Sequence, residues 1–164
     1  MQTEVENKYL VFRKSKIHNL GAYAAKPIRK GTRIIEYIGR PLTKKKAQTE
    51  LEDRNGYVFT INKFFDIDGS VQWNPARYIN HGCDANAESD IIDDRVWILA
   101  TRTIRKGEEV LYNYNYDLVD AFDNPCRCGA ENCVGYIVDD DYWPKLRKLI
   151  EKRGQRAKKK KRKR

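Results

Sequence analysis

The sequence predicts a mostly β domain with a few short helices, and three observations support this class. Short segments rich in β-branched and aromatic residues recur along the chain, and turn residues separate them. The longest apolar runs are a few residues, which suits strands and is far below the roughly 20 residues that span a bilayer. The 164 residues, 40% of them hydrophobic, fit one globular body with a modest core.

Strands are expected in six segments, each bounded by residues that favour turns. These segments are residues 9–12, 32–38, 57–62, 64–67, 88–92 and 95–103. Gly31 and Gly39 delimit the second segment, while Asp68-Gly69 and Asp93-Asp94 provide turns beside later ones. This alternation of strand and turn places the chain in the mostly β class.

A further strand is expected in the tyrosine-rich segment 107–116. Tyr112, Tyr114 and Tyr116 alternate there, so they would share one face of that strand. Aromatic residues with a period of two more often pack than catalyse, so the alternation alone assigns no function. The two histidines of the chain are equally uninformative alone, because a histidine in a turn usually only forms hydrogen bonds.

Two helices are expected. The first is a short, exposed helix at residues 44–52, because Thr43 is a good N-cap and helix-forming residues follow with little apolar stripe. The second spans residues 139–152, which begin with three aspartates, have Pro144 early and carry Lys and Arg late. The apolar side that would pack on the body consists of Leu146, Leu149 and Ile150.

The positive charge is concentrated at the C-terminal end. Residues 152–164 hold ten of the 33 Lys and Arg and no acid, which leaves 23 basic and 23 acidic residues elsewhere. We therefore expect a disordered basic tail at residues 153–164. The segment 152–164 could contact nucleic acid through phosphates or act as a nuclear address, and a purely solubilising tail is the alternative.

The N-terminal residues lack the basic and apolar regions of a secretory signal. We therefore expect an intracellular, reducing compartment, and no membrane partner. This compartment would be the nucleus in a eukaryote, and the cytoplasm or nucleoid in a prokaryote.

The four cysteines predict a metal site. Cys126 and Cys128 flank one residue, which disfavours a disulfide between them but suits two thiolates on one ion. Cys133 adds a third ligand, and Cys83 would complete a closed site of four thiolates, a set that selects zinc over hard cations. Because such a site leaves no open position, a single structural Zn²⁺ is expected. The alternative is four unrelated buried thiols.

Together these segments resemble the SET domain family of protein-lysine methyltransferases, with its post-SET zinc loop. The resemblance covers about residues 8–137. Its motifs are residues 15–24 with 30–31 and 36–39, residues 77–86, residues 107–116, and the Cys-x-Cys-x4-Cys of residues 126–133. It implies a SET domain at residues 8–117, a post-SET zinc loop at 122–138, and several small twisted β-sheets with a knot-like C-terminal crossing.

The resemblance also implies residue roles and a cofactor, S-adenosylmethionine. Tyr114 matches the catalytic tyrosine, Tyr112 the position that limits how many methyl groups are added, and Tyr37 a wall of the lysine channel. With Tyr112, mono- or dimethylation should be favoured. The residues that would bind the cofactor are His18, Asn19, Leu20, Gly21, Tyr57, Asn80 and His81.

The chain departs from the usual family residues at several positions. Gly82 and Ala85 stand where Ser and Pro are usual, and Asn113 replaces a common Asp. Asn19 stands in place of a glycine, but asparagine tolerates left-handed backbone geometry, so the loop can be retained.

Methyl transfer requires an uncharged amine, whereas a lysine with a pKa near 10.4 is almost fully protonated at neutral pH. Apolar, tyrosine-lined walls would desolvate the ammonium group and favour loss of its proton. The expected function is therefore methylation of lysine in a histone or another basic protein. The alternative is a weakly active or inactive module of this fold that binds chromatin or nucleic acid through its tail.

Overall fold

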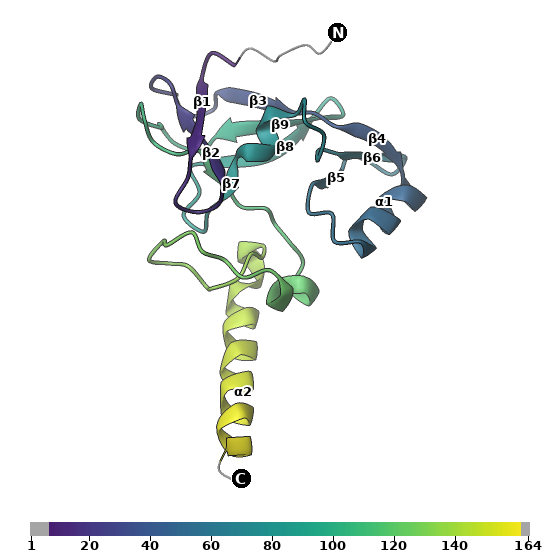
Figure 1. Cartoon of the computed structure of the whole chain (residues 1–164), viewed down its shortest axis with the longest axis vertical. Coiled ribbons are helices and arrows are strands. Elements are labelled where there is room, and N and C mark those ends of the chain that lie inside the picture. The colour runs from purple at the N-terminus through teal and green to yellow at the C-terminus, as the bar shows by residue number, and fades with distance from the viewer. Residues whose placement is uncertain (1–6, 162–164) are drawn as a thin grey trace. The chain divides into compact units, whose positions relative to one another are not determined.

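The computed structural model describes residues 7–161, and the side chains of residues 7–155. It consists of two compact units, which we describe separately (Figure 1). Of the described residues, the first unit comprises 7–80 and Ala85–Tyr112, and the second comprises His81–Asp84 and 113–161. The sequence analysis expected one body. The sequence did not indicate two units, because the chain first enters the second unit at the short segment His81–Asp84. No stretch of linker-like composition precedes or follows that segment.

The first unit contains three small sheets among the described residues. β1 (Leu10–Lys14) and β2 (Leu20–Ala24) form an antiparallel pair. A second sheet has the order β3-β9-β8-β10-β7, and a third the order β4-β6-β5. The bounds of their strands are β3 Arg33–Tyr37, β9 Arg95–Ala100, β8 Ala87–Ile92, β10 Leu111–Tyr112, β7 Asn80–His81, β4 Arg40–Thr43, β6 Phe65–Asp68 and β5 Val58–Thr60. The mostly β prediction is confirmed, whereas the knot-like crossing stays a prediction.

The six expected strands are present with shifts of a few residues, and β2, β4 and β7 were not predicted. The expected helix is confirmed as α1 (Lys44–Glu52), in which the Thr43 side chain accepts a hydrogen bond from the Lys46 N–H. Only Ala47 of this helix is buried, as its sparse apolar pattern indicated. A short 3-10 helix, η1 (Pro75–Tyr78), precedes β7.

Aliphatic residues from several strands and turns fill the interior of the first unit. Ile28, Ile98, Ile104 and Val110 are completely buried. Ile28 and Ile104 form an isolated antiparallel bridge, with hydrogen bonds of 2.9 Å in both directions between their backbone groups. Gly31 and Gly107 have φ of 79° and 82°, which allows tight turns after Lys30 and Lys106.

The tyrosine-rich segment differs from the prediction. Only Leu111–Tyr112 is a strand, so Tyr114 and Tyr116 do not share a strand face with Tyr112. The backbone turns where the Asn115 N–H donates to Asn113 Oδ1 at 3.1 Å, and Asn115 takes a φ of 53°. Such asparagine turns compete with strand geometry, which the alternating aromatic pattern concealed.

The second unit has few regular elements before its last helix. They are the 3-10 helices η2 (Leu118–Asp123) and η3 (Asp140–Tyr142), followed by α2 (Trp143–Lys161). Ala121, Val134, Val138 and Leu146 form its buried core. Leu146 and Ile150 are thus placed as their helical spacing predicted, with Ile150 packed on this core.

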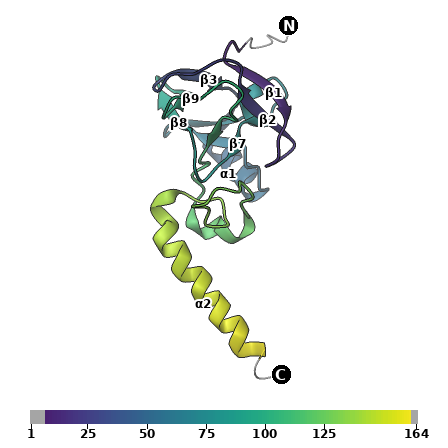
Figure 2. The same ribbon diagram turned by 90° about the vertical axis from the view of Figure 1, so that its left-hand side faces the viewer.

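The last helix is longer than expected. α2 continues through Lys161 (Figure 2), whereas the sequence analysis ended the helix at residue 152 and expected disorder from 153. Lys, Arg, Gln and Ala have high helix propensities, so the basic composition that suggested a disordered tail also allows a helix. Residues 162–164 of the predicted tail lie outside the described residues. In the described part of the chain, no helix has the length and apolar character needed to cross a membrane.

Candidate functional site

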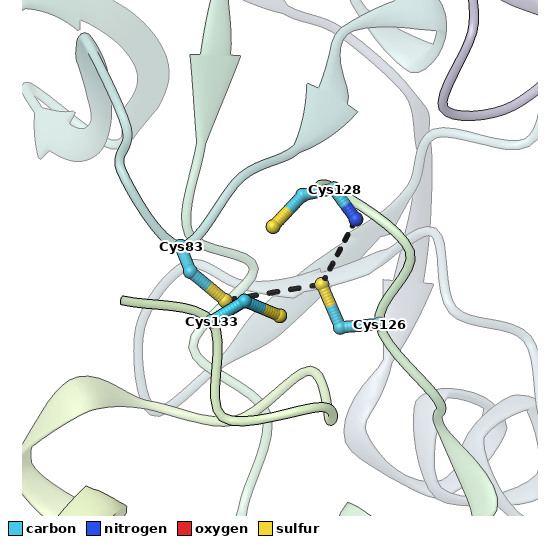
Figure 3. Close-up of side chains that lie close together, drawn as sticks. All are labelled: Cys83, Cys126, Cys128 and Cys133. Carbon is cyan, nitrogen blue, oxygen red and sulfur yellow. Dashed lines mark hydrogen bonds between the residues drawn. The ribbon is translucent and has the colours of Figure 1, made fainter. Parts of the chain in front are cut away.

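The four cysteines come together in the second unit. All four Sγ atoms lie within 4.8 Å of one another, and all four cysteines are free thiols (Figure 3). The Sγ atoms of Cys83 and Cys126 are 3.8 Å apart. Tetrahedral zinc with Zn–S bonds of about 2.3 Å requires sulfur atoms about 3.8 Å apart, so this spacing fits a zinc ion. The predicted cluster is confirmed, and its residues suit zinc in number, type and spacing.

Backbone geometry in the loop supports the cluster. The Cys128 N–H donates to Cys126 Sγ at 3.5 Å, and the Gly135 N–H donates to Cys133 Sγ at 3.3 Å. The second contact depends on a turn in which Gly135 has a φ of 84°. The Cys83 turn is held by the Asn132 side chain, which donates to the Cys83 carbonyl at 3.1 Å. The N–H groups of Cys128 and Gly135 stabilise negative charge on sulfur, as a thiolate metal site requires.

The thiols titrate unequally because they are crowded together. Burial raises the pKa values of Cys83 and Cys126, and charge repulsion from neighbouring cysteines raises that of Cys83 further. Burial also opposes ionisation of Cys128, but hydrogen bonds that its sulfur accepts from the backbone of Cys83 and Ala130 outweigh burial and help lower its pKa to about 7. A divalent cation would favour the thiolate form of all four residues.

His81 connects this cluster with the predicted catalytic tyrosine inside the second unit. Its Nδ1 accepts a hydrogen bond from the Tyr114 N–H at 3.3 Å, and its Nε2 lies 3.6 Å from Cys83 Sγ. Burial lowers the pKa of His81 to about 4, so the ring is neutral near pH 7. Because Nδ1 accepts, the ring proton must be on Nε2, where it can be donated to the sulfur.

Tyr114 is half-buried among aromatic rings of the second unit. Its ring centroid lies 5.4 Å from that of His81 and 5.8 Å from that of Tyr116. The preceding residue, Asn113, donates its side-chain amide to the Val138 carbonyl at 3.2 Å. An Asp at this position could not donate that hydrogen bond, so the departure from the usual family residue has a local structural use.

Two of the predicted catalytic residues lie in the first unit and belong to an aromatic cluster. The ring of Phe59 is 4.6 Å from that of Tyr37 and 6.5 Å from that of Tyr112. The three rings come from β5, β3 and β10, so the two sheets of this unit that contain these strands contribute to the cluster. Phe59 was missed by the sequence analysis. The only sequence feature that could have pointed to Phe59 is its position in a predicted strand, two residues after Tyr57 and therefore on the same face of that strand.

The position of Tyr37 is fixed by close packing. Its hydroxyl donates to the Tyr57 carbonyl at 3.2 Å, and a Cβ atom on Gly69 would clash with the ring carbon Cε1. Gly69 therefore serves this contact as well as the predicted turn. Tyr37 also borders a pocket of about 620 Å³ that Glu36, Trp73 and Arg95 help to line.

Tyr57, predicted to line the cofactor pocket, lies in the same unit. The guanidinium carbon of Arg77 is 5.2 Å from the centre of its ring. The Gly69 N–H also donates to the Tyr57 carbonyl, at 2.9 Å. These contacts fix Tyr57 in the unit that holds Tyr37, and its predicted role stays a prediction.

The predicted cofactor residues of the first unit gather around Asn80. The Asn80 side-chain nitrogen lies 3.1 Å from the Leu20 carbonyl and 3.3 Å from the His18 carbonyl. Asn19 has a φ of 36°, which confirms the left-handed backbone expected at this asparagine. Gly21 is buried, while His18, Asn19 and Leu20 are exposed. The chain thus forms a loop with accessible residues over a buried carboxamide.

Comparison with known proteins supplies a family for this arrangement. The SET domain family model matches residues 19–115. The chain is 39% identical over 143 residues to human histone-lysine N-methyltransferase 2D, covering 81% of this chain and 3% of that protein. It is 40% identical over 137 residues to Drosophila melanogaster histone-lysine N-methyltransferase trr, covering 77% of this chain and 6% of that protein.

A yeast relative and a solved structure are also similar to this chain. Saccharomyces cerevisiae histone-lysine N-methyltransferase, H3 lysine-4 specific, is 34% identical over 148 residues, covering 83% of this chain and 14% of that protein. A humanized mutant of the Chaetomium thermophilum Polycomb Repressive Complex 2, bound to the inhibitor GSK343, matches with a TM-score of 0.58 and 28% identity. That match covers 66% of this chain and 15% of the other. The chain thus spans a small part of the length of these relatives.

Proposed function

Because the chain belongs to the SET domain family, we propose that it is a protein-lysine N-methyltransferase. It uses S-adenosylmethionine to methylate the ε-amine of a lysine in a histone or another basic protein. The observation that carries this proposal is the aromatic cluster of Tyr37, Phe59 and Tyr112. Apolar aromatic walls suit a reaction in which a lysine must enter a desolvated channel and lose its proton.

When bound, S-adenosylmethionine supplies a methyl group on a positively charged sulfur. The protein residues position and desolvate the amine: Tyr37 and Tyr112 line its channel, and the Tyr114 hydroxyl orients it. These walls would keep the amine uncharged and aligned with the methyl group that the bound cofactor would supply, and the amine's proton would go to solvent beforehand. His18, Asn19, Leu20, Gly21, Tyr57, Asn80 and His81 hold the cofactor in this proposal.

The four cysteines hold one Zn²⁺ in the same proposal. A four-thiolate zinc site is closed, so its role is structural. The hydrogen bond from Tyr114 to His81, which also contacts Cys83, indicates what this site does for the chemistry. It fixes the backbone at the catalytic tyrosine.

Transfer of radiolabelled methyl groups to histones and other basic proteins tests the proposal. Tyr114→Phe should reduce labelling of lysine at least about a hundredfold, because it removes the group that orients the amine. Tyr142→Phe is the matched control, since this tyrosine is exposed at the end of η3 and should leave the rate unchanged. An unchanged rate in Tyr114→Phe would refute the assignment.

The product is set by Tyr112 in this proposal. Its hydroxyl occupies space that a more methylated amine needs, so mono- and dimethyl-lysine should dominate. Mass spectrometry of the product tests this, and Tyr112→Phe should shift it toward trimethyl-lysine. Abundant trimethyl-lysine from the unmodified enzyme would contradict it.

A second candidate function is suggested by the composition of α2, which carries ten Lys and Arg and a single Glu. The helix and residues 162–164 would bind nucleic acid or chromatin electrostatically, with catalysis weak or absent. Duplex DNA affinity should then fall steeply with salt and be lost when residues 152–164 are removed. Affinity that survives this truncation would exclude tail binding, and lysine labelling by the truncated chain would separate the two functions.

A further inference from the structure

The carboxamide of Asn80 has an orientation that its neighbours determine. Its nitrogen faces three acceptors: Glu109 Oε1 at 2.9 Å, the Leu20 carbonyl at 3.1 Å and the His18 carbonyl at 3.3 Å. The oxygen of the carboxamide could not replace the nitrogen here, because it would face acceptors only. Asn80 Oδ1 must therefore point away from Glu109.

The oxygen of this buried carboxamide is the group that remains to bind a ligand. Asn80 is 5% exposed, and its hydrogen bonds to the described residues 7–155 all use Nδ2 and leave Oδ1 without a protein donor there. A carboxamide oxygen accepts hydrogen bonds and has no hydrogen to donate. It suits an ammonium group, which donates hydrogen bonds and cannot accept them.

Glu109 is held firmly enough to impose this orientation. Its second oxygen, Oε2, accepts from the Tyr23 hydroxyl at 3.0 Å. The backbone of Glu109 forms an antiparallel bridge with Tyr23, flanked by a 2.8 Å hydrogen bond from the Val110 N–H to the Ala22 carbonyl. The Arg13 guanidinium carbon lies 3.8 Å from the centre of the Tyr23 ring.

Gly21 allows the carboxylate to approach. A Cβ atom on Gly21 would clash with Glu109 Oε1, so any side chain at this position would displace the carboxylate. The segment predicted to bind the cofactor thus leaves space for Glu109. The sequence analysis assigned no role to Glu109.

We propose that Glu109 is a positioning residue for the cofactor. Through Asn80 Nδ2 it turns the carboxamide so that Oδ1 accepts a hydrogen bond from the ammonium group of the amino-acid part of S-adenosylmethionine. This inference rests on the proposed function, because it takes S-adenosylmethionine as the ligand. Glu109 itself does not touch the cofactor, and its effect passes through Asn80.

Binding measurements on the full chain test this by calorimetry, with S-adenosylhomocysteine and with methylthioadenosine, which lacks the amino-acid part. Glu109→Ala should weaken S-adenosylhomocysteine about tenfold, because a charge-assisted hydrogen bond that orients Asn80 is lost. Methylthioadenosine should bind within about twofold of the unmodified protein. Glu109→Gln, which keeps a neutral acceptor, should recover part of the affinity and weaken binding only about threefold. Glu88→Ala, an exposed acid on β8, is the matched control and should bind like the unmodified protein.

A double-mutant cycle identifies Asn80 as the intermediary. In an Asn80→Ala background, Glu109→Ala should have no further effect on S-adenosylhomocysteine affinity. Equal weakening of both ligands, or an undiminished effect in that background, would overturn the inference. If Glu109→Ala does not fold, Glu109→Gln should still weaken S-adenosylhomocysteine selectively, by about threefold, and equal weakening of both ligands would again overturn the inference. If the unmodified protein binds neither ligand, the proposed function itself fails.

Discussion

The two units are stabilised in different ways. The first has three sheets and a core of aliphatic residues that includes Ile28, Ile98 and Ile104. The second has 3-10 turns, one helix and a buried core of four residues, together with the cysteine cluster. Small bodies with little apolar core usually need a metal or disulfides to fold. We therefore predict that the second unit depends on the metal ion proposed for its cysteine cluster, whereas the first unit does not.

Zinc removal is the strongest test of this difference. A chelator should increase hydrogen exchange across residues 118–150, while β8 and β9 keep their protection. Structural zinc contributes roughly 10–16 kcal/mol in small domains, far more than the four-residue core can replace. Peptide-resolved hydrogen exchange measures both units at once, and Cys126→Ser should reproduce the chelator's effect. Protection of residues 118–150 that persists without metal would contradict the dependence.

A core substitution sharpens the comparison. Leu146 is completely buried, so Leu146→Ala should destabilise the second unit by about 2–5 kcal/mol. Because metal binding and folding are coupled, the same variant should bind zinc more weakly. Competition with a coloured chelator measures that affinity. Leu51→Ala, which removes a half-exposed leucine of α1 in the first unit, is the control and should not change it.

The opposite outcome is equally informative. If Leu146→Ala leaves zinc affinity unchanged, the cysteine loop folds independently of the core beneath it. The second unit would then be two elements rather than one.

Local patterns predicted much of the first unit. The Thr43 cap, the strands near residues 33–37 and 95–100, and the turns at Gly31 and Gly107 depend on neighbouring residues, which sequence displays directly. β2 and β4 were missed because tertiary pairing makes them strands: β2 pairs with β1, and β4 contains Pro41 and pairs with β6. The residues of the candidate site divide in the same way, into those that local sequence patterns indicate and those that only tertiary contacts reveal.

The cysteine cluster was predictable because only four cysteines exist and their spacing suits a metal. Glu109 and Phe59 were not, because their importance comes from contacts with residues distant in the chain. Glu109 contacts Asn80 and Tyr23, and Phe59 lies beside Tyr37 and Tyr112. No period or motif around either residue encodes such contacts. The end of α2 was misjudged for another reason, because a run of Lys and Arg is compatible with both disorder and helix.

Acid pH should affect the stability of the two units differently, although this effect is smaller. In the first unit it depends on Glu108. Its partial burial opposes ionisation, but hydrogen bonds from Arg102 at 2.6 Å, the Arg105 N–H at 2.9 Å and Asn86 at 3.1 Å outweigh it. They lower its pKa to about 2 from an ordinary value of 4.5. Since the folded-state pKa is depressed, the stabilisation is fully present above pH 4.5 and is lost as pH falls toward 2.

Because solvent screens this partly exposed group, Glu108→Gln should cost only about 1 kcal/mol of unfolding free energy at pH 7, and it should flatten the loss of stability between pH 4.5 and 2. The control is Glu88→Gln, which changes an exposed acid in the same unit.

In the unmodified chain, protons compete with zinc for the thiolates, so the second unit should open at a higher pH than the first. Denaturant unfolding at several pH values measures the unfolding free energy of the Glu108→Gln variant. Hydrogen exchange at the same pH values shows which of the two units opens at the higher pH. If the first unit opens before the second, the stability of the second unit does not rest mainly on its thiolates, and the contrast between the units is wrong.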